Sequence, residues 1–207
     1  MQGLTVVDHP LLAATVTRLR DETTLVPEFR RLLDQAATLM IADVTRDLAT
    51  KAVRVKTPLA MAPGAVLRRP VILVPILRAG LAFLDAFQRV MPTAKVGFVG
   101  VKRDAVTHQA HTYSSSLPDD LKGLEVIVLD PMLATGGSAV ATLDLLWQRG
   151  ARQLRLVTLV SAPPGVETVL RAHPSVRVYT AALDPKLNSQ AYIVPGLGDA
   201  GDRAFGV

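Results

Sequence analysis

The chain has 207 residues, of which 49% are hydrophobic and 20% charged, and this balance is that of a globular protein, not a disordered one. It contains no cysteine, which excludes disulfides, thiol nucleophiles and zinc–thiolate sites and favours a reducing, cytoplasmic setting. The net charge of +5 comes from dispersed basic residues, and only 4% of residues are aromatic, too few for a stacking platform, so we expect no nucleic-acid partner.

The N-terminal part of the chain predicts helix and no targeting segment. Asp8 and Arg18 interrupt the apolar residues there, so we find no signal-peptide core and expect no export. Residues 25–48 carry apolar side chains at helical spacing and predict one long amphipathic helix with a structural role. The predicted apolar face consists of Phe29, Leu32, Leu33, Ala36, Leu39, Met40, Val44 and Leu48.

From residue 71 onward, short apolar runs alternate with helical stretches. This alternation predicts an α/β fold with a doubly wound, mainly parallel sheet and flanking helices. The longest run, residues 71–77, has seven residues, far fewer than the ~18 that a bilayer span requires, so we expect no membrane insertion. We predict one domain, residues 1–207, that includes a small appendage. The predicted strands are 71–76, 96–101, 126–129, 156–160 and 176–183, and a helix from Pro164 must end before Pro174.

Two segments show no period. Residues 104–122 are polar, and a loop of this length is typical of a lid or a disordered segment. His108 and His111 lie in it without a nearby pair of acids, so we expect no metal site there. The tail from Pro185 is rich in glycine and proline and predicts irregular structure, with no closing strand or helix.

Residues 126–138 read VIVLDPMLATGGS and carry the most informative motif. The apolar run 126–129 predicts a strand in the buried middle of the parallel sheet. Asp130 follows at the carboxyl end of that strand, and open α/β sheets bind their ligands outside this edge. We therefore expect a ligand beside Asp130.

The glycines of this motif predict an anion site. Gly136 and Gly137 let backbone N–H groups approach a negative charge closely, and a helix predicted to start beside them adds its positive end. Thr135 and Ser138 contribute hydroxyl donors. A plain tight turn is the alternative interpretation of the two glycines. No lysine follows them, which excludes the phosphate loop of nucleoside triphosphatases and favours a phosphate monoester, as in a phosphorylated sugar.

Two arginines follow predicted strands. Arg78 comes after the run 71–76, within VPILRAG, and Arg103 follows the run 96–101. A guanidinium is costly to bury without a partner, so we expect each to face a ligand or an acid. Its planar fork pairs two phosphate oxygens at once, which suits a phosphate ligand, while an ion pair with a nearby carboxylate is the structural alternative.

The C-terminal glycines imitate another motif. Gly196, Gly198 and Gly201 spell the GxGxxG pattern of dinucleotide-binding proteins, after a strand-like YIV. Six residues follow Gly201, too few for the helix that would bind the pyrophosphate, so we do not expect NAD binding.

Three motifs in order, VPILRAG, LDPMLATGGS and YIVPGLGDAGDR, resemble those of type I phosphoribosyltransferases, in the form found in the uracil phosphoribosyltransferase family. Most type I relatives carry two adjacent acids at the strand end, whereas Pro131 stands at the second position here, as in the uracil branch. The similarity covers nearly the whole chain. It implies the type I fold with a small irregular hood built from terminal segments, in which residues 185–207 bind the base.

The resemblance implies transfer of the 5-phosphoribosyl group from 5-phosphoribosyl 1-diphosphate (PRPP) to uracil, which gives UMP and diphosphate. Asp130, Arg78 and Arg103 match the catalytic positions. Mg²⁺ is implied as a cofactor held mainly through PRPP, with no protein ligands of its own. The implied PRPP-binding residues are Arg78, Arg103, Asp130, Pro131, Met132, Leu133, Ala134, Thr135, Gly136, Gly137, Ser138 and Asp199, and the implied uracil-binding residues are Ile193, Gly198, Asp199 and Ala200.

Other properties that the resemblance raises stay open. The family implies a homodimer or a higher homo-oligomer, and regulation by GTP is undecided. The family's Leu-x-Pro near the centre of residues 104–122 is replaced by His108 and Ala110, with Tyr113 retained, which leaves the role of this loop open. Two other functions also remain: a phosphoribosyltransferase for another base such as hypoxanthine or xanthine, and an RNA-binding regulator on the same fold that senses PRPP or nucleotides. The regulator would need a concentrated basic face.

Overall fold

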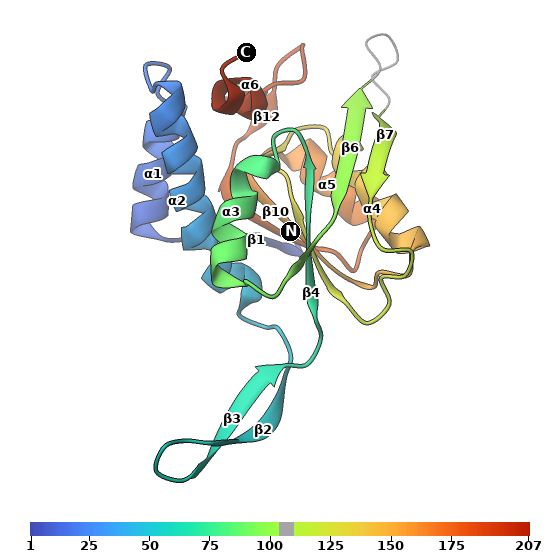
Figure 1. Ribbon diagram of the computed structural model, residues 1–207. Coiled ribbons are helices and arrows are strands. Elements are labelled where there is room, and N and C mark those ends of the chain that lie inside the picture. The colour runs from blue at the N-terminus through green and yellow to red at the C-terminus, as the bar shows by residue number, and fades with distance from the viewer. Residues whose placement is uncertain (104–109) are drawn as a thin grey trace.

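The computed structural model of the chain describes residues 1–103 and 110–207, and the side chains of residues 103, 110 and 111 are outside that description. Its central sheet has the strand order β1-β11-β10-β8-β4-β6-β7, with β5 beside β4 and β9 beside β10 (Figure 1). All described pairs in it are parallel except β6 with β7, so the predicted α/β class is confirmed. The strands are β1 (Leu4–Val6), β4 (Val71–Leu77), β5 (Lys95–Val96), β6 (Phe98–Arg103), β7 (Ala110–Ser116), β8 (Glu125–Leu129), β9 (Met132–Leu133), β10 (Gln153–Ser161) and β11 (Arg177–Leu183).

Every apolar run that predicted a strand lies in this sheet, with one interruption. The predicted strand 96–101 is two strands, because Gly97 separates β5 from β6 and donates its N–H to the carbonyl of Leu73 at 2.9 Å. β8 is buried along its whole length, as a central parallel strand should be.

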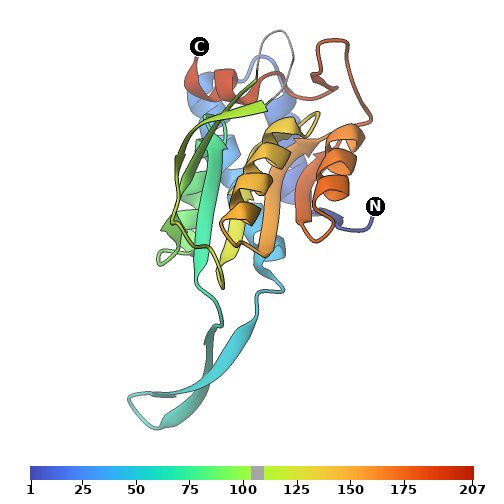
Figure 2. The same cartoon turned by 90° about the vertical axis from the view of Figure 1, so that its right-hand side faces the viewer.

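Helices cover both faces of the sheet (Figures 1 and 2). Ile127 and Leu129 of β8 pack into a core shared with α1, α2 and α3, whereas Val126 and Val128 point to the opposite face and pack with α4 and α5. Among the described residues no helix is both long and apolar enough to cross a membrane. The helices are α1 (Pro10–Arg20), α2 (Val26–Thr45), α3 (Leu81–Val90), α4 (Gly137–Gln148), α5 (Pro163–Ala172) and α6 (Ala200–Phe205).

The predicted long helix exists and is slightly shorter than residues 25–48. α2 starts after Leu25 and ends at Thr45. Most of its predicted apolar face is buried, while Leu39 and Leu48 are half-buried. The helix predicted from Pro164 is α5, which begins one residue earlier and ends at Ala172, before Pro174.

An antiparallel hairpin that the sequence did not predict projects away from the sheet (Figures 1 and 2). It consists of β2 (Thr50–Lys56) and β3 (Met61–Leu67), and we call residues 50–67 the arm. Nearly all its side chains are exposed, so neither strand shows the clear alternation of a half-buried strand.

Two predictions of irregular structure need correction. Part of the predicted loop 104–122 is β7, which pairs with the edge of β6, while residues 104–109, with His108, lie outside the described part. The tail is not wholly irregular either. It forms a two-stranded ladder of β12 (Lys186–Leu187) with β13 (Ile193–Val194), and then α6. α6 forms despite its short length because the Asp199 carboxylate caps it by accepting the N–H of Asp202 at 2.9 Å.

Candidate active site

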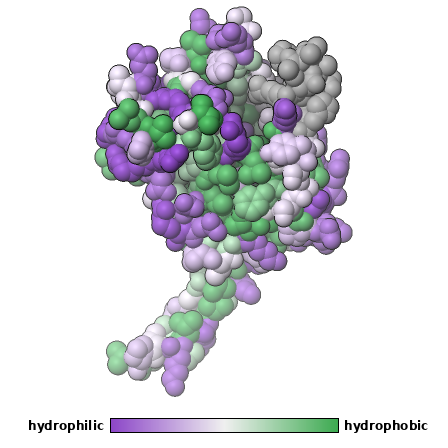
Figure 3. Space-filling model, turned by 45° about the horizontal axis from the view of Figure 1, so that its top comes forward, coloured by the Kyte–Doolittle hydropathy of each residue, from purple (hydrophilic) through white to green (hydrophobic). Residues whose placement is uncertain are grey.

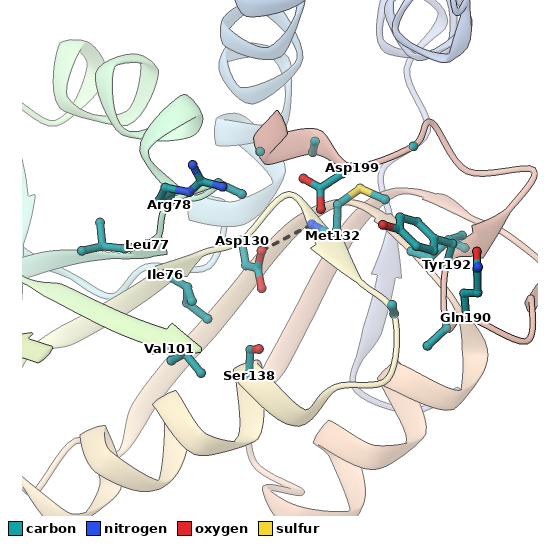
Figure 4. Close-up of a pocket in the computed structure, with 17 residues that line it drawn as sticks. Ile76, Leu77, Arg78, Val101, Asp130, Met132, Ser138, Gln190, Tyr192 and Asp199 are labelled. Atoms are coloured by element: carbon teal, nitrogen blue, oxygen red, sulfur yellow. Dashed lines mark hydrogen bonds between the residues drawn. The ribbon is translucent and has the colours of Figure 1, made fainter. Parts of the chain in front are cut away.

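A cleft of about 440 Å³ lies at the carboxyl ends of β4 and β8, under the C-terminal tail (Figure 4). Its walls come from the end of β4, the loop after β8, the first turn of α4 and the tail around residues 190–201. Open α/β sheets bind ligands at this edge, and the cleft brings together segments that are far apart in the sequence.

Asp130 lies in the middle of the cleft, between the end of β4 and the start of α4 (Figure 4). Its backbone N–H donates to the carbonyl of Val157 at 3.1 Å, which fixes the end of β8 against β10. The N–H of Met132 lies 3.5 Å from a carboxylate oxygen of Asp130. The half-buried carboxylate is therefore held at the sheet edge, where it supplies negative charge to the cleft.

Gly136 forms the N-cap of α4 in a conformation that needs glycine. Its φ is +87°, in the left-handed region, and a Cβ there would lie 2.8 Å from the carbonyl oxygen of Gly165. α4 then begins at Gly137 with no acidic residue in its first turn, and Ser138 lines the cleft. The N–H groups of the first helical turn have no partners within the helix, so the cleft contains an electropositive helix end that suits an anion.

The turn after β4 packs closely against the end of β8. A Cβ on Gly80 would lie 2.2 Å from the carbonyl oxygen of Leu129, so only glycine permits this approach. The peptide bond between Leu77 and Arg78 is cis. The turn places the Arg78 side chain at the cleft, with Nη2 3.3 Å from a carboxylate oxygen of Asp202. Arg78 thus both lines the cleft and pairs with an acid.

The tail that covers the cleft is tied to α1. The Arg20 guanidinium donates to both carboxylate oxygens of Asp184 at 2.7 Å, and to the carbonyl of Gly196 at 2.8 Å. Asp184 also accepts the N–H of Gly196 at 2.8 Å. These bonds fix the start and the middle of the tail to one another and to the N-terminal helix.

Arg203 fastens the end of the tail. Its guanidinium donates to the carbonyls of Leu19 and Asp21 at 2.6 Å and of Leu197 at 2.9 Å, and lies 4.3 Å from the centre of the Phe29 ring. Burial among these groups lowers the pKa of Arg203 from its ordinary value. We call α1, the start of α2 and residues 184–207 the hood.

Comparison with known proteins decides the family. The family profile described as "Uracil phosphoribosyltransferase" matches residues 6–207. The chain belongs to the uracil phosphoribosyltransferase family. It is 50% identical over 202 residues to the uracil phosphoribosyltransferase of Dictyoglomus turgidum, and the aligned region covers 97% of this chain and 98% of that protein. It is 52% identical over 208 residues to the uracil phosphoribosyltransferase of Kineococcus radiotolerans, with 99% of each covered.

Solved structures agree with the observed fold. The structure of the AQ2163 protein from Aquifex aeolicus has a TM-score of 0.93 at 33% identity and covers 99% of this chain and 98% of its own. A purine phosphoribosyltransferase from Pyrococcus horikoshii has a TM-score of 0.51 at 14% identity over 73% of this chain, which shows a shared fold alone. The resemblance and the type I phosphoribosyltransferase fold drawn from the sequence are thus confirmed.

The three family motifs meet at the cleft, although not every residue that they implicate lines it. Pro131, Leu133 and Gly136 are buried, and neither Thr135 nor Gly137, the first residue of α4, lines the cleft. Arg103 ends β6 at the same edge of the sheet, but its side chain is outside the described structure. The implicated residues that line the cleft are Arg78, Asp130, Met132, Ala134, Ser138, Ile193, Gly198, Asp199 and Ala200.

Several lining residues escaped the sequence interpretation. Ile76 and Leu77 are the last residues of β4. In the sequence they belong to an apolar run that indicates only a buried strand, not a cleft. Tyr192 opens the third motif, and this exposed aromatic residue next to Ile193 was the available signal. Figure 4 shows Tyr192 near Met132 on the tail side of the cleft. The other lining residues that were not predicted are Ala79, Val101, Gln190, Ala191 and Gly201.

The described residues can support a magnesium ion that arrives with a ligand. No group of three or more His, Cys, Asp or Glu side chains in that part of the chain could hold a metal by itself. Asp130 and Asp199 both line the cleft, however. Mg²⁺ commonly takes one or two carboxylates together with substrate phosphates and water, so these residues fit the ion implied for this family.

Proposed function

We propose that the chain transfers the 5-phosphoribosyl group of PRPP to N1 of uracil, with inversion at the anomeric carbon. The bond from this carbon to the diphosphate oxygen breaks, the bond to N1 forms, and the N1 proton is released. The observation that carries the proposal is the meeting of all three family motifs at one cleft. Uracil as the base rests on the family, since relatives with about half of their residues in common carry that name.

The anion site at α4 is proposed to hold the 5′-phosphate. The first-turn N–H groups and the Ser138 hydroxyl supply donors, and no acidic residue in that turn opposes a phosphate. Binding energy gained at this remote group would position the reacting carbon near Asp130. Thr135 and Gly137, on either side of Gly136, are proposed to contribute backbone N–H groups.

Charge neutralisation is proposed to provide most of the rate acceleration. Arg78 and Arg103 would stabilise the negative charge that grows on the departing diphosphate, and Asp130 the positive charge that grows on the sugar. Mg²⁺, held with PRPP beside Asp130 and Asp199, would supply further neutralisation of the diphosphate. No covalent intermediate with the protein is required.

The tail is proposed to recognise the base through its backbone. Uracil presents two carbonyls and an N–H, which the backbone groups of Ile193 and of residues 198–200 can match at close range. Tyr192 and Met132, which line the same part of the cleft, offer walls for a flat ring. Asp199 would face the donor.

The experiment that tests this function is uracil consumption by the purified protein with PRPP and Mg²⁺. We expect UMP and diphosphate in equal amounts, and no product with hypoxanthine or xanthine at the same concentrations. Product with one of those bases and none with uracil would replace the proposed substrate. A parallel series with GTP tests the regulation that the sequence leaves open, and cytoplasmic location stays a prediction.

We also propose that two copies associate through the arm. Cross-strand neighbours Val55 and Ala62 share one face of the hairpin with Val66, and Leu59 at its tip is 97% exposed. Figure 3 shows hydrophobic residues along the arm and a hydrophobic area on the body above it. An isolated hairpin is only marginally stable in water, so a second copy that covers this face would stabilise it.

Sedimentation tests the association. We expect the wild-type chain to sediment as a dimer or larger, and the double substitution Val55→Asp and Val66→Asp to give a monomer with a normal circular dichroism spectrum. Replacement of Thr50, on the other face, by Asp is the matched control and should leave the mass unchanged. A wild-type chain that is monomeric at micromolar concentration would refute the proposal.

A further inference from the structure

An ion pair beside the cleft joins the first and the third family motif. Arg78 comes from the turn after β4, and Asp202 from the first turn of α6, 124 residues later. Their side chains meet at 3.3 Å and are 60% and 48% exposed. The pair therefore links the wall that carries the diphosphate-binding candidate to the tail that carries the base-binding candidates.

We infer that Asp202 is a positioning residue that holds Arg78 at the tail until a diphosphate group takes its place. The inference rests on the proposed function, because it assumes that Arg78 binds the diphosphate of PRPP. Asp202 would act as an internal substitute for the ligand, because one of its carboxylate oxygens contacts the guanidinium that phosphate oxygens would later bind. In the free protein Asp202 would keep the Arg78 side chain oriented. It would also compete with the diphosphate for that side chain.

The position of Asp202 is set by the hood and not by Arg78. α6 is capped by Asp199, and Arg203 in its last turn donates to carbonyls of α1 and of the segment that follows α1. Arg30 of α2 donates to the carbonyl of Ala204. Because these contacts hold α6 independently, loss of the Asp202 carboxylate should free Arg78 without displacing the helix.

The same arrangement links the two substrate subsites. Ala200 and Gly201 line the cleft on the turn of α6 that presents Asp202. When a diphosphate draws Arg78 away, α6 loses this ion pair with the turn after β4, and the backbone groups proposed to bind uracil lose one restraint. Asp202 thus couples binding at the proposed diphosphate subsite to binding at the proposed uracil subsite.

Binding of inorganic diphosphate in the presence of Mg²⁺, measured by calorimetry, tests the inference. The substitution Asp202→Asn keeps the size of the side chain and removes the competing charge. An exposed ion pair contributes little, so we expect the dissociation constant to fall by about two- to five-fold. In kinetics, the KM for PRPP should fall while kcat stays the same or decreases, and the midpoint of thermal unfolding should not change.

Two further variants test whether Asp202 acts through its contact with Arg78 or only through its negative charge. Asp85→Asn on α3 makes the same change in net charge, and Asp85 has no part in the proposed machinery. It should leave diphosphate binding unchanged. Combined with Arg78→Ala, the Asp202→Asn substitution should lose its effect, because the residue through which it acts is gone.

The outcomes distinguish this inference from the proposed function. Tighter diphosphate binding that requires Arg78 supports the inference. Unchanged or weaker binding in Asp202→Asn, or equal tightening in the Arg78→Ala background, overturns it and leaves the transferase function intact. If the wild-type protein binds no diphosphate, both the inference and the proposed function are wrong.

Discussion

Arg20 and Asp184 lie 164 residues apart in the chain and form a two-pronged ion pair with both nitrogen–oxygen distances at 2.7 Å. Both also bond to Gly196, whose N–H reaches Asp184 and whose carbonyl accepts from Arg20. Gly196 lies between Ile193 and Gly198, two residues of the proposed uracil-binding segment. The pair therefore sets the shape of that segment from outside the cleft.

The first prediction concerns this pair. Asp184→Ala leaves the Arg20 guanidinium and the Gly196 N–H without their shared acceptor in a largely buried place. We expect a loss of about 2–3 kcal/mol in the free energy of unfolding. We also expect a rise of about ten-fold in the KM for uracil, with a smaller change in the KM for PRPP. Urea denaturation and steady-state kinetics measure the two effects.

A second ion pair, more exposed, serves as the control. Arg89 donates from Nη2 to both oxygens of Asp34 at 2.7 Å. The side chains of Arg89 and Asp34 are 57% and 37% exposed, against 25% and 6% for Arg20 and Asp184. Asp34→Ala should therefore cost at most about 1 kcal/mol and leave both KM values alone. Equal losses from the two substitutions would mean that burial does not distinguish the pairs.

The second prediction concerns Asp130. Asp130→Asn keeps the volume of the side chain and its hydrogen-bond acceptor, so the fold should be retained. It removes the negative charge that is proposed to stabilise the developing sugar cation. We expect kcat to fall roughly a hundred-fold with an unchanged thermal midpoint. Near-normal turnover in this variant would contradict the role assigned to Asp130.

The third prediction concerns Arg78. Arg78→Ala should raise the KM for PRPP by at least about ten-fold, since a charge-assisted hydrogen bond to the diphosphate is lost, and should affect the KM for uracil much less. Arg89→Ala removes the same charge from nearby α3 and is the matched control. Hydrogen bonding to Asp34 raises the pKa of Arg89, so the control substitution removes a charged side chain. A response to PRPP that is the same in both variants would refute the assignment.

The parts of this fold that the sequence predicts are those with a local signal. Buried strands such as β4 and β8 show continuous apolar runs because helices cover both faces of the sheet. The cleft loop after β8 is equally local, since Asp130, Gly136 and the start of α4 are close together in the chain. This one short segment contains both the residues that shape the loop and the residues proposed to bind the ligand.

The parts that escaped prediction depend on distant partners or on exposure. β7 is a polar edge strand that exists through its pairing with β6, and the arm is exposed on both faces. The pairs of Arg20 with Asp184 and of Arg78 with Asp202 join segments more than a hundred residues apart. No period or motif in one segment indicates which distant charge it will meet.

The last prediction concerns Gly136, where glycine is required both by the positive φ and by close packing against α5. Gly136 and Gly123 both have positive φ values, +87° and +74°. A Cβ at Gly123 would meet nothing within 4 Å, whereas at Gly136 it would lie 2.8 Å from the Gly165 carbonyl oxygen and 3.1 Å from the Cβ of Thr168. Gly123→Ala should therefore cost only about 1 kcal/mol of stability, for the backbone conformation alone.

Gly136→Ala should cost at least about 2–3 kcal/mol, because the added methyl group forces α4 away from α5 as well. That movement displaces the first-turn N–H groups, so binding of ribose 5-phosphate should weaken in this variant and not in Gly123→Ala. Urea denaturation gives the first quantity and calorimetric titration with ribose 5-phosphate the second. If both variants lose equal stability and bind ribose 5-phosphate like the wild type, the close packing of Gly136 has no role in the anion site.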